Sequence, residues 1–112
     1  MRVIKSSSPS IAYVYGLVCP ASHVVRYVGQ TTCLDKRYRQ HCRGHKATSE
    51  WTQTLAAHPA LVLLETVHAP GNELLRAARV AETKWIKRFR RTVINKYTRE
   101  NNPKVWDALV NR

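Results

Sequence analysis

RYVGQTTCLDKRYRQHC, residues Arg26–Cys42, passes from one kind of regular structure to another within a few positions. Its first residues, with those just before them, are rich in valine and tyrosine and predict a strand over residues 23–29 that ends at Gly29. The second half predicts a basic helix over about residues 33–43, which Gly44 stops. A strand therefore leads directly into a helix that carries several cations.

Two more strands are predicted on either side of this stretch. IAYVYGLV, residues 11–18, is rich in β-branched and aromatic side chains, which favour strands. Pro20 and Ser22 lie between this strand and the next and are typical turn residues, so the two strands should form a hairpin. ALVLLETV, residues 60–67, predicts a third strand, and its apolar character predicts that it is largely buried.

Two further helices are predicted between and after these strands. One covers residues 49–58 and is broken by Pro59, and the other covers about residues 73–91. The longer helix has an apolar stripe at spacings of three and four residues, with Leu75 and Ile86 beside it. The stripe consists of Leu74, Ala78, Ala81, Trp85 and Phe89.

The order of these elements is β-β-α-α-β-α, and every strand can pair with its neighbours in an antiparallel way. This order predicts an α+β domain with a small three-stranded antiparallel sheet flanked by helices. We expect a flexible N-terminal arm over residues 1–10 and a single domain over residues 11–112. A C-terminal extension should begin at about residue 98 and include a short helix over residues 104–110.

The chain of 112 residues is strongly basic. Its 19 Lys and Arg against 7 Asp and Glu give a net charge of +12. So many positive charges repel one another in a compact fold, and proteins that carry them usually bind a polyanionic partner. Nucleic acid is the leading candidate for that partner, and an anionic membrane surface is the second.

The cysteine count and the N-terminal residues indicate in which cellular compartment we expect the protein. Cys19, Cys33 and Cys42 are odd in number, and no secretory signal is recognisable, so a disulfide framework is not expected. No apolar run approaches the length of a membrane span. We therefore expect a cytoplasmic protein. A zinc site at Cys42 and His45 is disfavoured because no second pair of ligands with suitable spacing exists.

Helical periodicity separates the cations of the first predicted helix. Arg37 and His41 lie one turn apart on or beside the inward face, whereas Lys36 and Arg39 point elsewhere. Two interpretations remain open at this point. His41 can be a half-buried, hydrogen-bonded histidine beside an arginine that extends to solvent. Alternatively, Arg37 holds a phosphate while His41 orients or moves a proton.

Glu82 is a carboxylate beside the apolar stripe of the long helix. Such a group must be paired, exposed at the end of the stripe, or bound to a cation, and the sequence favours a cation no more than a salt bridge to an internal arginine. Mg²⁺ is commonly held by one or two carboxylates together with water and substrate phosphate oxygens. On the strands, Tyr13 suits ordinary packing, whereas a tyrosine near an arginine can accept a proton.

Several ordered motifs resemble the GIY-YIG nuclease family. Tyr13-Val14-Tyr15 and Tyr27-Val28-Gly29, separated by a short turn, are similar to the tripeptides that give the family its name. YVGQTTCLDKRYRQH continues the resemblance into the following helix, AETKWIKRF resembles the tract of the metal-binding glutamate, and Ile94-Asn95 resembles the terminal asparagine. The resemblance covers roughly residues 11–97. Tyr13 replaces a glycine of the usual tripeptide, and Lys96-Tyr97 stand where many relatives have a pair of glycines.

The resemblance implies a divalent-metal DNA endonuclease that uses Mg²⁺ or Mn²⁺. It implies that the two tyrosines flank the scissile phosphate, that the arginine stabilises its charge, and that the histidine assists proton transfer or positions a tyrosine. It also implies that Glu82 binds the metal and that the asparagine holds the site or a phosphate by hydrogen bonds. The catalytic set would be Tyr15, Tyr27, Arg37, His41, Glu82 and Asn95.

One active site would nick one strand, as a monomer or in a transient dimer, without an obligate protein partner. Stand-alone members are frequent in phages and mobile elements, so the resemblance implies such an origin, in a bacterial or phage-infected cell. Basic side chains on both longer helices are expected to contact DNA phosphates. They are Arg39, Arg43, Lys46, Lys84, Lys87, Arg88 and Arg91. The alternatives are a non-catalytic nucleic-acid-binding module on the same scaffold and, less favoured, a regulator that binds an acidic protein.

Overall fold

The fold was obtained as a computed structural model, which describes residues 10–45 and 48–95. The expected helix over residues 104–110, most of the N-terminal arm and Lys46 lie outside the described residues. Three strands form one sheet: β1 (Ile11–Val18), β2 (Val25–Thr31) and β3 (Ala60–His68). The helices are α1 (Leu34–Cys42), α2 (Ser49–Thr52) and α3 (Gly71–Arg88).

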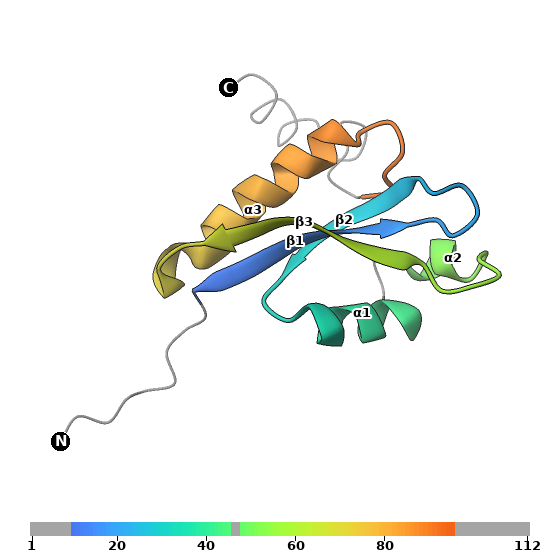
Figure 1. The fold of residues 1–112 in the computed structure, drawn as a ribbon, viewed down its shortest axis with the longest axis horizontal. Coiled ribbons are helices and arrows are strands. Elements are labelled where there is room, and N and C mark those ends of the chain that lie inside the picture. Colours follow the sequence, from blue (N-terminus) through green and yellow to red (C-terminus); the bar gives the residue numbers. More distant parts are fainter. Residues whose placement is uncertain (1–9, 46–47, 96–112) are drawn as a thin grey trace.

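The sheet is antiparallel, with the strand order β2-β1-β3. The predicted α+β class and the element order β-β-α-α-β-α are therefore confirmed. Figure 1 shows α3 on one face of the sheet and α1 on the other. Because β1 is the central strand, its alternate residues reach both layers.

An apolar core fills the space between the sheet and α3. Ala12, Val14 and Val28 supply it from β1 and β2, where they share one face of the sheet. From α3 come Leu74, Ala78, Ala81 and Ile86, at the helical spacing that the sequence predicted. Leu75, expected beside this stripe, is instead exposed, so the apolar face of α3 is narrower on that side.

The other face of β1 carries Tyr15 and Leu17, which are fully buried beneath the layer that contains α1 and α2. Here His41 is the one buried residue of α1, and Thr48 is buried just before α2. This second layer therefore contains polar groups, whereas the α3 layer is almost entirely apolar.

The expectation that the third strand is largely buried is wrong. Val62 and Leu63 are exposed, and 52% of the surface of Leu63 is accessible. The physical reason is the strand order, because β3 is an edge strand with a neighbour on one side only. An apolar run alone cannot distinguish a central strand from an edge strand.

The second helix is also shorter than predicted, since α2 ends at Thr52 and not at residue 58. The hydroxyls of Thr52 and Thr54 donate to the carbonyls of Ser49 and Trp51, three residues earlier. Such side-chain bonds compete with the continuing helix. The long helix α3 likewise ends before the predicted residue 91, and Phe89 occupies its C-cap.

The outer edge of β2 is covered by the residues that follow α3. The N–H of Ile94 donates to the carbonyl of Arg26 (2.7 Å), and the side-chain amide of Asn95 bonds both backbone groups of Val28. A bare edge would expose unpaired backbone groups to other chains. The segment after α3 therefore completes β2 without adding a regular strand.

A register shift in the β1–β3 pairing lies beside Tyr15. Val14 faces Glu65 and Tyr15 faces Leu63, so Leu64 is an extra residue on β3. Such bulges bend a strand and redirect side chains, and they are common next to functional sites.

Gly29 gives Tyr15 the space for its ring. The two residues are directly opposite each other across β1 and β2. A Cβ atom added at Gly29 would lie 2.6 Å from Cζ of Tyr15 and closer still to its hydroxyl oxygen. The aromatic ring therefore lies across the glycine, and no residue with a side chain fits there.

Replacing Gly29→Ala should destabilise the fold by at least about 2 kcal/mol, because the new methyl group must displace a fully buried ring. Gly16→Ala is the matched control, since the nearest atoms to its Cβ would be side-chain atoms of Val62, Val25 and Leu64 at 3.2, 3.3 and 3.5 Å. Urea unfolding of both variants measures the difference. Equal midpoints for the two variants would show that Tyr15 does not need the glycine.

Candidate active site

Three aromatic rings from different elements meet on the α1 face of the sheet. The ring centroids of Tyr15 and Tyr27 are 6.3 Å apart, and His41 lies 5.7 Å from Tyr15 and 5.2 Å from Tyr27. The histidine stands edge-on to Tyr27, a favourable arrangement for aromatic pairs. The predicted residues Tyr15, Tyr27 and His41 are thus brought together.

A buried hydrogen-bonded chain runs through His41. Its Nε2 lies 2.7 Å from the hydroxyl of Tyr15, and its Nδ1 lies 2.8 Å from the hydroxyl of Thr48. Tyr15 and His41 both have 0% of their surface exposed. His41 therefore connects the central strand to the start of α2.

Burial changes the ionisation of both partners. It raises the pKa of Tyr15 far above its ordinary value, and the neighbouring Tyr27 adds to the rise, while Arg37 opposes it as a charge and as a hydrogen-bond donor. The pKa of His41 is lowered to about 4, first by burial and then by His45 and Arg37. At neutral pH the imidazole and the phenol are both uncharged.

Arg37 is the positive charge at the centre of the cluster. After burial, its charge helps to lower the pKa values of His41 and His45, and it opposes the rise in the pKa of Glu82. Its side chain is only partly exposed. The predicted arginine therefore lies between α1 residues and a carboxylate supplied by α3.

Glu82 reaches the same place from the opposite face of the sheet. Burial raises its pKa to about 7, and Arg79, Arg37 and a hydrogen bond from the backbone N–H of Gln30 act against that rise. Among the described residues, the one ion pair within 4.0 Å joins Lys84 and Glu65. The charges of Arg79 and Arg37 thus act on Glu82, although neither arginine forms an ion pair with it within 4.0 Å.

A divalent cation fits this arrangement. A half-buried carboxylate without a contact ion pair costs free energy to ionise, and a bound cation would offset that cost. Within the described residues, no three His, Cys, Asp or Glu side chains form a cluster that could hold a metal alone. Glu82 suits an ion such as Mg²⁺ that takes its remaining ligands from water and phosphate oxygens.

Asn95 does not lie among the rings. It is 5% exposed, its Oδ1 accepts from the N–H of Val28 at 2.9 Å, and its Nδ2 donates to the carbonyl of Val28 at 2.6 Å. Both ends of the amide are therefore used by β2. This geometry favours the prediction that Asn95 holds the site by hydrogen bonds.

Two residues near His41 were not predicted as part of the site. Thr48 bonds its Nδ1, and the ring of His45 lies 4.6 Å from that of His41. The spacing of four residues between the histidines was a signal for the second of these. Nothing in the sequence pointed to Thr48, which lies beyond the helix and its terminal glycine.

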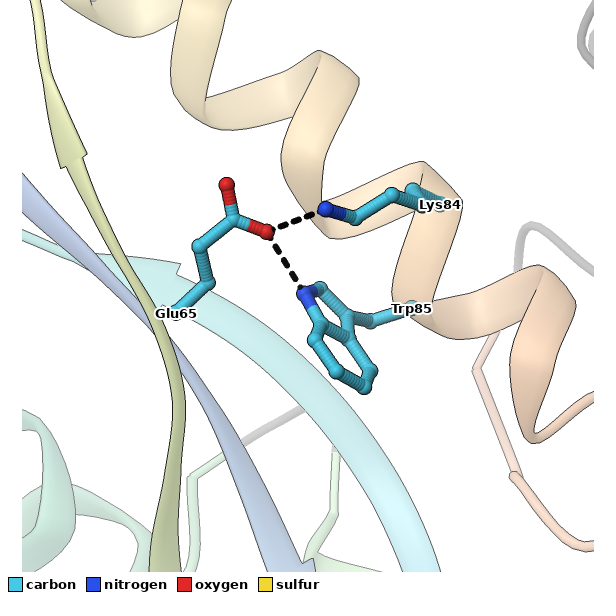
Figure 2. Close-up of polar contacts among 3 residues, drawn as sticks. All are labelled: Glu65, Lys84 and Trp85. Atoms are coloured by element: carbon cyan, nitrogen blue, oxygen red, sulfur yellow. Dashed lines mark hydrogen bonds and ion pairs between the residues drawn. The ribbon is translucent and has the colours of Figure 1, made fainter.

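The predicted DNA contacts are divided between the two faces of the sheet. Arg39 and Arg43 are exposed on or just after α1, Lys84, Lys87, Arg88 and Arg91 lie on or after α3, and Lys46 lies outside the described residues. Figure 2 shows that Lys84 and the indole of Trp85 both bond the same oxygen of Glu65 on β3. The ammonium of Lys84 is therefore already paired. No described helix is long and apolar enough to cross a membrane.

The structure thus brings two tyrosines of a three-stranded sheet, an arginine of α1 and a carboxylate of α3 into one region, and the family match below shows a nuclease-type domain. The family model of the GIY-YIG catalytic domain matches residues 11–98. The chain belongs to this family, as the resemblance implied. Members of the family generally depend on a divalent metal. No curated protein and no solved structure matches the chain.

Replacing Asn95→Asp should destabilise the fold by about 2–4 kcal/mol, because an oxygen would replace the donor that faces the carbonyl of Val28. Asn72→Asp, exposed at the start of α3, serves as the control. Chemical denaturation gives the difference. If Asn95→Asp unfolds like the unmodified protein, Asn95 does not hold β2.

Proposed function

We propose that this chain is a divalent-metal-dependent DNA endonuclease that hydrolyses one phosphodiester bond and so nicks one strand. One observation carries the proposal. Arg37 on α1 and Glu82 on α3 influence each other at the outer edge of β2, although the two helices lie on opposite faces of the sheet. A fixed cation and a carboxylate that suits a metal are the groups that phosphoryl chemistry requires.

Arg37 and Glu82 have complementary roles in this proposal. The guanidinium of Arg37 binds the scissile phosphate and stabilises the charge that develops on it. Glu82 holds Mg²⁺ or Mn²⁺, and the bound ion offsets charge on the leaving oxygen. The burial of Glu82 supports this assignment, because a bound cation would offset the cost of ionising a carboxyl group in this position.

The exposure of the two tyrosines supports different roles for them. Tyr15 is fully buried and its hydroxyl is bonded to His41, whereas Tyr27 is partly exposed. We therefore assign Tyr27 to the substrate side, where it takes a proton from the attacking water. Tyr15 and His41 lie behind it and fix the positions of the groups in front. Asn95 supports β2, the strand that carries Tyr27.

DNA is the substrate that a nuclease domain implies, and the net charge of +12 supports phosphate binding across the surface. A monomer with one site nicks, and a double-strand break requires a transient dimer or two encounters. We place the protein in the cytoplasm of a bacterial or phage-infected cell, as a homing-endonuclease-like product of a phage or mobile element. The free thiols of Cys19, Cys33 and Cys42 suit a reducing compartment.

A non-catalytic nucleic-acid-binding module is the second candidate. The basic surface suits both functions equally. Glu82 favours the enzyme, because a half-buried carboxylate beside a phosphate site repels the ligand of a simple binder and serves it in no other way.

Supercoiled plasmid incubated with the protein and Mg²⁺ or Mn²⁺ should relax to the nicked form, and chelation of the metal should stop the reaction. Arg37→Ala and Glu82→Gln should each reduce the single-turnover rate by at least about 100-fold, because each removes stabilisation of the transition state. Gel electrophoresis under saturating protein measures the rates.

Matched control variants distinguish the loss of a catalytic group from the mere loss of a charge on the same helix. Arg39→Ala removes an exposed cation of the same helix, and Glu73→Gln removes an exposed carboxylate of α3, so both should retain most of the single-turnover rate. A folded protein that leaves plasmid intact with every metal would refute the proposed activity. Nicking that persists in Arg37→Ala and Glu82→Gln would refute the assignment of the site.

The side chains that hold DNA should be those nearest the site. Arg39→Glu combined with Arg43→Glu should weaken binding strongly and reduce the slope of log K against log salt by roughly two, about one for each lost phosphate contact. Lys84→Ala should change binding little, because its ammonium is paired with Glu65. Fluorescence anisotropy over a range of salt tests both, and the reverse order of effects would place DNA along α3.

A further inference from the structure

Thr48 is a buried threonine whose hydroxyl does not perform the usual task of its position. It is the N-cap of α2 and is 1% exposed, yet its side chain makes no capping hydrogen bond to that helix. The hydroxyl lies 2.8 Å from Nδ1 of His41 and 3.5 Å from the carbonyl oxygen of His45. A threonine at an N-cap ordinarily accepts from the helix backbone. Here its contacts belong to the histidines of the site.

The carbonyl of His45 determines which group donates in the hydrogen bonds that link Thr48, His41 and Tyr15. A carbonyl only accepts, so the proton of the Thr48 hydroxyl points to it and the hydroxyl oxygen is left to accept from Nδ1–H of His41. A neutral imidazole carries one proton, so Nε2 is then an acceptor. The hydroxyl of Tyr15 accordingly donates to Nε2 across 2.7 Å.

The same order of donors and acceptors extends beyond Tyr15 to Arg37. Arg37 is close enough to the hydroxyl of Tyr15 to act on its pKa both as a charge and as a hydrogen-bond donor. A guanidinium has donors only, so it requires lone pairs and not a proton from the phenol. With the other tautomer of His41, the proton of the Tyr15 hydroxyl would lose its acceptor inside a fully buried site.

We propose that Thr48 is a positioning residue that fixes the Nδ1–H tautomer of His41 and thereby holds Arg37, through Tyr15, in place to receive the scissile phosphate. This inference rests on the proposed function, because it assigns Arg37 the phosphate. Thr48 itself touches neither substrate nor metal in this arrangement.

The groups around His41 keep its imidazole neutral at pH 7, so the ring must adopt one of its two tautomers. Tyr15 and Tyr27 face the imidazole from the sheet, Arg37 from its own helix, and His45 from the turn after it. Burial, His45 and Arg37 all disfavour the imidazolium and lower its pKa to about 4. One nitrogen is therefore free to accept, and Thr48 decides which.

Nitrogen NMR of the histidine rings tests the proposal directly. The ring nitrogens of His41 in the whole protein at pH 7 should show Nδ1 protonated and Nε2 unprotonated. Thr48→Val, which keeps the side-chain shape and removes the hydroxyl, should populate the Nε2–H tautomer. Thr48→Ser should keep the original tautomer. Thr52→Val is the matched control, because within the described residues its hydroxyl bonds the carbonyl of Ser49 and no group of the site.

Kinetics supply the second measurement. At saturating DNA, Thr48→Val should reduce the rate of nicking about tenfold, the effect of a 1.4 kcal/mol loss at the transition state, while KM stays nearly constant. Thr48→Ser and Thr52→Val should retain the rate. A structural role alone would lower the melting temperature without changing the tautomer.

The outcomes that overturn the proposal are specific. Nε2–H in the unmodified protein, or unchanged Nδ1–H in Thr48→Val, refutes the proposed tautomer control. Should Thr48→Val fail to fold, a folded Thr48→Ser with an altered tautomer refutes it instead. If the unmodified protein cuts no DNA, the proposed function fails, whereas the NMR result still decides the direction of the hydrogen-bonded chain.

Discussion

The hydrogen bond between Tyr15 and His41 joins the central strand to the layer that carries the arginine. It is buried, 2.7 Å long, and spans 26 residues of sequence. Three constraints converge on it: Gly29 leaves room for the ring, the extra residue Leu64 bends the pairing beside it, and Thr48 bonds the far side of the imidazole. This bond, together with the hydrogen bond from the Tyr38 hydroxyl to the carbonyl of Pro59, attaches α1 and its Arg37 to the sheet side of the molecule.

The two faces of the sheet have different roles: the α3 face supplies stability, and the α1 face holds the polar groups of the candidate site. The α3 face has the apolar core, whose burial supplies most of the favourable free energy of folding. The α1 face buries polar groups, each of which must keep a partner, and among the described residues none is left without one. Glu82 is the connection between the layers, since it starts from the stable helix and reaches the polar site around the edge of β2. Such a division lets a small domain keep a costly polar cluster without weakening its core.

Much of this organisation could be predicted from local sequence. The strand at Ile11–Val18 and the phase of α1 were predictable, because alternation and helical spacing report which side of an element is buried. The exposure of β3 was not, since strand order depends on contacts between distant residues. The role of Asn95 was only half predictable: its type and place were recognised, but its partner Val28 lies 67 residues away. Thr48 was missed because a hydroxyl in an irregular segment has no periodicity to reveal it.

The closure of β2 by Asn95 has a consequence for synthesis of the protein. The arginine, the tyrosines and the histidine all leave the ribosome early, but Glu82 and the asparagine that completes the edge of their strand are made near the end of the described domain. Chains are made from the N-terminus, so an unfinished chain has Arg37 without Glu82 or the completed edge of β2. The cluster of Arg37 and Glu82 is therefore complete only when translation of the domain has passed Asn95.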